Sequence, residues 1–122
     1  MVSKYPRAPG AAPPVDLGGG EWLYTAMSEE RVLANCPDVH DCTVVSLEAD
    51  GRVVTDVLLA LHADADPDAD RTPAVRAALT DAAAATLRRV VAVSEEELII
   101  GPTGKVRKFL MRQRHLAEMA AL

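Results

Sequence analysis

The sequence predicts an α+β fold in which helices cover a small three-stranded sheet. Two β-branched runs flank the dipeptide Asp50-Gly51, which is typical of a β-hairpin turn, and a third such run follows a segment of helical period. Strands joined by a hairpin and interleaved with helices form one sheet with its helices packed against it. Apolar residues make up 49% of the 122 residues but aromatic residues only 3%, so the core must be aliphatic.

Composition excludes several classes of protein. The net charge of -5 argues against a general nucleic-acid binder, which needs an excess of Lys and Arg. No apolar run approaches the roughly 18 residues of a membrane span, and the first residues lack the apolar core of a signal peptide. Two cysteines, Cys36 and Cys42, do not make a disulfide framework. We therefore expect a reduced cytoplasmic protein with no nucleic-acid or membrane partner.

The first 20 residues predict a flexible arm, and residues 21–122 a single domain. Four prolines and the run Gly18-Gly19-Gly20 fall in this arm. Proline removes a backbone donor and glycine loses the most entropy on ordering, so we expect little regular structure there.

A helix is predicted to follow, starting with Thr25 or Ser28 as its cap and ending at Cys36-Pro37-Asp38. Glu29 and Glu30 would lie in its first turn, where the helix dipole favours anions. Its predicted buried side chains are Met27, Val32 and Leu33.

Three strands are predicted, over residues 42–47, 52–62 and 89–93. Before the third strand, Thr72-Pro73 predicts a helix start with Thr as N-cap and Pro at the first helical position. This helix would run on to residue 87 with an apolar stripe of Val75, Leu79, Ala82 or Ala83, and Leu87. A C-terminal helix is predicted from about Lys105, with one face formed by Val106, Phe109, Leu110, Gln113 and Ala117.

Four motifs in register resemble one family. The segment 101–108, Gly-Pro-Thr-Gly-Lys-Val-Arg-Lys, is similar to a Pro-(Thr/Ser)-Gly-Lys loop that precedes a basic helix. The segments 19–24 and 29–33 are similar to a Gly-Gly-Glu-Asn-Val-Tyr-Pro turn and the helix after it, with one residue inserted. Residues 37–45 and 88–93 resemble the family's first core strand and the strand before its lysine loop. The family is that of the adenylate-forming ligases (acyl-CoA synthetases), and residues 19 to 115 resemble their small C-terminal domain.

The resemblance implies a mobile lid in a two-step reaction. A carboxylate attacks the α-phosphate of ATP, the lid rotates, and a thiol of CoA or of a carrier protein's pantetheine takes the acyl group. On this basis Lys105 is the predicted catalytic residue, in a loop with Thr103 and Gly104. Gly19, Gly20 and Glu21 would belong to the face that forms the thioester, and Asp16 would stand for the hinge aspartate, although it lies closer to the turn than the family spacing requires.

The family's ATP, adenine and acyl sites belong to a large domain that has no counterpart in this sequence. We therefore expect ATP with Mg, and CoA or carrier-protein pantetheine, to bind through a separate large adenylation domain. We expect this chain alone to bind no cofactor and to be inactive. The main hypothesis is a split ligase, in which this chain supplies Lys105 in trans. The alternatives are a non-catalytic module that docks a carrier protein or regulates an enzyme, and a relic fragment.

Each motif has a simpler interpretation. Lys105 can be the first residue of a solvated basic helix, and Gly18–Gly20 can be a linker. The basic run from Arg107 to Arg114 can be either a solvated face or an edge that docks an acidic partner or a nucleotide phosphate. The alternating Asp64, Asp66, Asp68 and Asp70 lack the Gly and Glu of a calcium loop. Cys36, His40 and Cys42 lack a fourth zinc ligand at a usual spacing. We expect no metal site.

Overall fold

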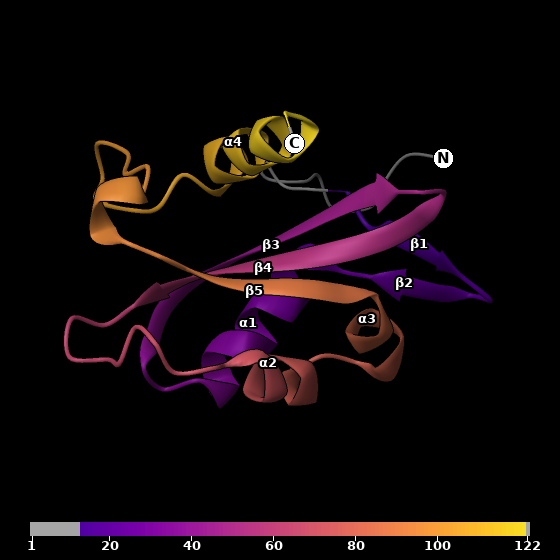
Figure 1. Cartoon of the computed structure of the whole chain (residues 1–122), viewed down its shortest axis with the longest axis horizontal. Coiled ribbons are helices and arrows are strands. Elements are labelled where there is room, and N and C mark those ends of the chain that lie inside the picture. Colours follow the sequence, from indigo (N-terminus) through magenta and orange to yellow (C-terminus); the bar gives the residue numbers. More distant parts are fainter. Residues whose placement is uncertain (1–12, 122) are drawn as a thin grey trace.

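The computed structural model describes residues 13–121. Figure 1 shows a central sheet with helices on both faces, and the predicted α+β fold is confirmed. The elements in chain order are β1 (Val15–Gly18), β2 (Glu21–Leu23), α1 (Thr25–Asn35), β3 (Val39–Ala49), β4 (Arg52–Leu61), α2 (Thr72–Ala78), α3 (Asp81–Thr86), β5 (Leu87–Val93), the 3₁₀ turn η1 (Glu95–Glu97) and α4 (Lys108–Ala120). None of the described helices is long and apolar enough to cross a bilayer.

The main sheet has the order β3-β4-β5. β3 and β4 form an antiparallel hairpin whose turn residues Asp50 and Gly51 have φ of 53° and 76°, as the dipeptide predicted. β5 returns parallel to β4 after α2 and α3, because a parallel partner requires a crossover connection. Both outer strands, β3 and β5, are therefore edges of the sheet.

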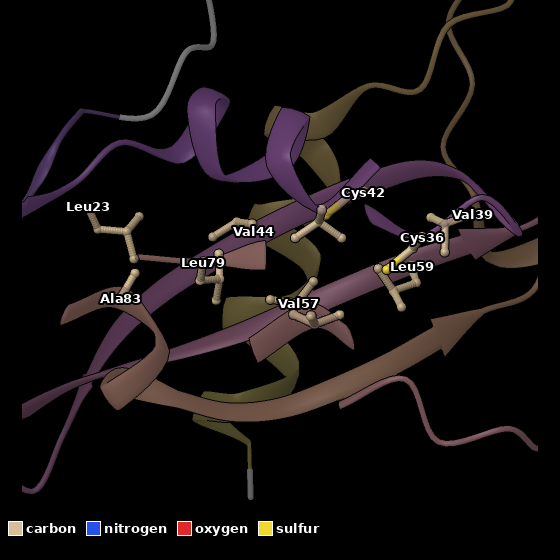
Figure 2. Close-up of a cluster of buried hydrophobic side chains, with 11 residues drawn as sticks. Leu23, Cys36, Val39, Cys42, Val44, Val57, Leu59, Leu79 and Ala83 are labelled. Atoms are coloured by element: carbon tan, nitrogen blue, oxygen red, sulfur yellow. The ribbon is translucent and has the colours of Figure 1, made fainter. Parts of the chain in front are cut away.

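The two faces of the sheet are unequal. Helices α1, α2 and α3 cover one face and build the larger core, which Figure 2 shows as an aliphatic cluster around Val44, Val57 and Leu59. Helix α4 lies alone on the other face, where Met111 packs on Val45 and Leu58. Because Met111 and His115 are the only buried residues that the structure describes in α4, polar contacts must contribute much of its attachment.

The structure corrects four expectations about individual elements. Residues 15–18 of the predicted arm form β1, which pairs with β2, because the turn Gly18–Gly20 lets this part of the chain fold back on itself. The rest of the predicted arm, residues 1–12, lies outside the described residues. The helix predicted from Thr72 to residue 87 is interrupted at Thr80, whose hydroxyl accepts a hydrogen bond from the Ala83 amide and starts α3.

The other two corrections concern buried faces. Met27, which was expected inside α1, is 50% exposed, whereas Glu29 is buried. Helix α4 begins at Lys108 rather than Lys105 and buries Met111 and His115, while Phe109 is 50% exposed. In both helices the buried face carries a charged or titratable side chain whose partner lies in a distant segment, so local periodicity points to the wrong face.

Candidate functional site

The lysine loop is a tight hairpin. Ile100 and Val106 form an antiparallel bridge, the Gly104 amide donates to the Gly101 carbonyl at 3.0 Å, and the Gly101 amide donates to the Lys105 carbonyl at 2.9 Å. This hydrogen-bond pattern is that of a three-residue hairpin loop closed by a glycine bulge. Gly104 has φ of 80°, a conformation that favours glycine. The backbone therefore fixes the direction in which residue 105 leaves the loop.

Gly101 lies against the side chain of Arg107 across the hairpin. A Cβ added there would lie 2.8 Å from Cδ of Arg107, so a larger residue would require this exposed, flexible side chain to move. The Arg107 amide also donates to the Ile99 carbonyl at 2.7 Å. The base of the hairpin is thereby joined to the start of α4.

Lys105 is exposed at this hairpin, next to the exposed Thr103 and Gly104. Among residues 13–121, no carboxylate pairs with its ammonium group and no acceptor receives a hydrogen bond from it. The sequence alternative of a first helical residue is wrong, because α4 starts three residues later. The geometry presents a cation on a rigid support.

The remaining basic residues of this stretch are largely occupied within the chain. Lys108 Nζ lies 3.2 Å from Glu29 Oε1 and 3.4 Å from Asp41 Oδ1, and Arg112 Nη2 donates to Glu29 Oε2 at 2.9 Å. Arg114 donates to the Glu97 carbonyl. The solvated-face interpretation is therefore wrong for Arg112, whose side chain is 13% exposed, whereas Lys108 and Arg114 are bound within the chain but keep side-chain exposures of 32% and 38%.

Glu29 joins the two layers of the molecule. Its carboxylate is 4% exposed, accepts from the Val44 amide at 2.8 Å, and binds both cations from α4. Burial opposes the charged form of Lys108, but Glu29 and Asp41 outweigh it and raise the pKa of the Lys108 ammonium. Sequence analysis placed Glu29 at a helix dipole and missed this role, since no local signal marks it.

A second polar contact fixes the other end of α4. Asp56, fully buried on β4, accepts from Arg88 Nε at 3.0 Å and Nη2 at 2.6 Å, and lies 2.7 Å from His115 Nε2. Burial acts to raise the pKa of Asp56, but the hydrogen bonds from Arg88 and His115 outweigh it and hold the pKa below its usual value. The Asp56 site therefore tethers the helix that follows the lysine loop.

The glycine turn is a structured hairpin between β1 and β2. Gly18, Gly19 and Gly20 have φ of 86°, 60° and 82°, and nothing lies within 4 Å of a Cβ added at any of them. Asp16 lies in β1, opposite Trp22, and its carboxylate accepts from the Gly18 amide at 2.8 Å. The linker interpretation is wrong for this turn, which presents exposed glycine backbone beside the exposed Glu21.

The structure does not bring the two predicted groups together. In Figure 1 the segment between η1 and α4, which carries Lys105, lies at one end of the long axis, and the tip of the β1–β2 hairpin lies at the other. Lys105 with Thr103 and Gly104 therefore forms one surface, and Gly19, Gly20 and Glu21 form a separate one.

Other candidate ligands have structural roles. Asp66 and Asp70 accept hydrogen bonds from the amides of Asp68 and Thr72, so they shape their own loop. Cys36 and Cys42 are buried free thiols in the larger core, and burial raises the pKa of both. Across residues 13–121 no group of three or more His, Cys, Asp or Glu is placed to hold a metal.

Comparisons with known proteins bear on this geometry. No family model matches the sequence. A curated Streptomyces protein, 3-aminoavenalumate diazotase, is 33% identical over 113 residues, with 79% of this chain and 20% of that protein covered. An acyl-CoA synthetase from Brucella canis matches with a TM-score of 0.63 at 20% identity, over 82% of this chain and 18% of its own. An anthranilate CoA ligase, solved with anthranoyl-AMP, matches with a TM-score of 0.62 at 26% identity, over 85% and 20% of the two chains. This chain thus spans about a fifth of the length of each.

Proposed function

This chain has the fold of the C-terminal region of the adenylate-forming ligases, and we propose that it acts as their lid. It supplies Lys105 in trans to a separate large domain, which activates a carboxylic acid with ATP for thioester formation.

The observation that carries the proposal is the environment of Lys105. Its neighbours Lys108, Arg112 and Arg114 are bound within the chain, whereas Lys105 is exposed on a hairpin fixed by glycine. Adenylation brings a carboxylate against the α-phosphate of ATP, and the two anions repel one another. An ammonium group between them stabilises the charge that develops in the transition state. A cation already neutralised by the protein would do this less well.

The rest of the catalytic apparatus belongs to the partner. The solved ligases that match are about five times longer than the matched region, and one of them, an O-succinylbenzoate CoA synthetase from Bacillus subtilis, was solved with ATP and magnesium. In this proposal, ATP with Mg, and CoA or carrier-protein pantetheine, bind in the large domain. The exposed backbone of Gly19 and Gly20, at the opposite end of the chain from Lys105, then faces the incoming thiol after the lid rotates.

The test requires the reconstituted pair. The large domain is identified by copurification with the tagged chain, and pyrophosphate release is measured with both polypeptides present. Lys105→Ala is expected to lower the adenylation rate by about 10²–10³-fold. Arg31→Ala, which removes an exposed cation from α1, is the matched control and should leave the rate unchanged. Undiminished adenylation by the Lys105→Ala pair would overturn the proposal.

A second candidate is a non-catalytic module that docks a carrier protein or regulates an enzyme. Trp22, Tyr24 and Met27 are 45%, 50% and 50% exposed within six residues of chain, and these residue types are enriched in protein interfaces. This alternative predicts carrier-protein binding that is lost in Trp22→Ala but unchanged by ATP and by Lys105→Ala. Dependence of that binding on Lys105 would count against it.

A further inference from the structure

The two edges of the main sheet, β3 and β5, differ in whether other groups of the protein bind their outer backbone groups. At the β3 edge, the Val44 amide donates to Glu29 Oε2 at 2.8 Å and the Val44 carbonyl accepts from Arg112 Nε at 3.2 Å, so side chains occupy the backbone groups. At the β5 edge, no strand within residues 13–121 pairs with the outer side, since the sheet order ends at β5. Side-chain hydrogen bonds thus cover the β3 edge at Val44, whereas the β5 edge is open among the described residues.

The open edge has few of the features that prevent pairing. Exposed edge strands are usually protected by charge, proline or a bulge, because their unpaired amides and carbonyls bind other strands. Residues 90–93 of β5 read Val-Val-Ala-Val, with no charge and no proline. Val91 is 38% exposed, and Ala92 is also exposed. This segment can therefore add a strand.

The charges that flank this segment select the partner. Arg88 and Arg89 come directly before it, and Glu95, Glu96 and Glu97 come shortly after it. In a parallel pair of two such strands, arginine would face arginine and glutamate would face glutamate. In an antiparallel pair, the basic start of each strand faces the acidic end of the other, and like charges are separated. We propose that β5 is a dimerisation edge, which pairs antiparallel with β5 of a second copy of this chain.

The register follows from the same charges. A two-fold axis at Ala92 places Val91 opposite Val93 of the second copy. It also brings Arg89, near the start of each strand, beside Glu95 in the turn η1, which follows the end of the other strand, and each contact occurs twice. Arg89 and Val91 share the sheet face of their β4 neighbours, Asp56 and Leu58. Among the described residues, no side chain forms an ion pair with Arg89 or Glu95, so both are available. The result is a continuous six-stranded sheet.

The experiment measures self-association of the full chain by sedimentation equilibrium, from micromolar to millimolar concentration. The unmodified chain is expected to form a reversible dimer. Arg89→Glu and Glu95→Arg each place like charges across both symmetric contacts, and each should weaken the dimer by about tenfold.

An equimolar mixture of these two variants tests the register. In the mixed dimer, the carboxylate introduced at position 89 of one chain faces the guanidinium introduced at position 95 of the other. The second symmetric contact keeps the original Arg89 and Glu95. Both contacts then pair opposite charges, so the mixture should recover the affinity of the unmodified chain.

Two further variants complete the design. Val91→Lys introduces a charge into the apolar centre of the edge and should abolish the dimer. Arg31→Glu, an exposed reversal on α1, is the matched control and should leave it intact. Circular dichroism establishes that each variant is folded.

A chain that stays monomeric over the whole range would overturn the proposal. So would a dimer that is insensitive to Arg89→Glu and Val91→Lys, because another surface would then mediate it. Failure of the mixture to recover would overturn the antiparallel register. None of these variants touches Lys105, so the outcome is independent of the proposed function.

Discussion

Lys105 and Lys108 lie three residues apart in one basic stretch, and their environments are opposite. Lys105 is exposed at a glycine-closed hairpin and has no ion-pair partner among residues 13–121. The Lys108 side chain is 32% exposed and lies between Glu29 and Asp41. The first region is arranged to present a cation, and the second uses cations to hold α4 on the sheet.

The difference comes from segments far away in the sequence. Glu29 is 79 residues before Lys108 and is buried beside the β3 edge, where it also accepts from the Val44 amide. A buried carboxylate needs partners, because desolvation of a charge is expensive. The basic stretch therefore divides into Lys108, Arg112 and Arg114, whose side chains bind within the chain, and Lys105 and Arg107, which are exposed and have no ion-pair partner among residues 13–121. Substitutions in either region test this difference.

The largest expected effect is at Glu29. Glu29→Ala leaves Lys108 and Arg112 without their shared anion and the Val44 amide without its acceptor, so we expect a loss of about 3 kcal/mol in the free energy of unfolding. Urea unfolding followed by circular dichroism measures it. Glu30→Ala, the exposed neighbour on α1, is the matched control and should leave the stability unchanged. Equal stabilities of the two variants would show that Glu29 does not hold α4.

The next effect is a pH dependence at Asp56, the second tether of α4. The folded pKa of Asp56 is below its unfolded value, so its contribution is present above about pH 4 and is lost as the pH falls through the folded pKa. The unfolding free energy should therefore decrease as the pH falls below about 4, and Asp56 should account for part of that decrease.

Asp56→Asn tests that assignment, because it removes the titrating carboxyl and keeps its shape. The variant should be less stable at pH 7 and should lose less stability between pH 5 and pH 2. Some acid slope will remain, since the pKa values of Asp38, Asp70 and Glu97 are also lowered by their hydrogen bonds. An unchanged slope in the variant would assign the acid sensitivity to those carboxylates instead.

Much of the fold could be predicted because its signals are local. The turn dipeptide Asp50-Gly51 and the β-branched runs located the hairpin, and Pro37 lies just past the end of α1, as expected. The lysine loop was also located by its sequence, since Pro102 and Gly104 have backbone preferences of their own. Whether Lys105 is catalytic stays a prediction.

The remainder depends on contacts between distant segments. The apolar stripe of α4 suggested that Phe109 faces inward, but His115 reaches Asp56 and Arg112 reaches Glu29, which turns Phe109 outward. Similarly, the apolar period of this segment continues through Thr80, so it does not indicate that the helix is interrupted there. Pairings of this kind are fixed by tertiary packing and cannot be predicted from the helical period of the sequence.

The smallest expected effect comes from replacing each of the two lysines by alanine in turn, which compares their contributions to stability directly. Lys108→Ala removes a partly buried ion pair but leaves Arg112 on Glu29, so we expect a loss of roughly 1 kcal/mol in unfolding free energy. Because the pKa of Lys108 is raised in the fold, this contribution is present below about pH 10 and is lost above it.

Lys105→Ala should leave the free energy of unfolding unchanged at every pH, since the Lys105 side chain forms no ion pair or hydrogen bond among residues 13–121. Thermal unfolding at pH 7 and at pH 11 measures both. If Lys105→Ala destabilised the chain as much as Lys108→Ala, Lys105 would be structural, and an activity loss in that variant would no longer indicate catalysis.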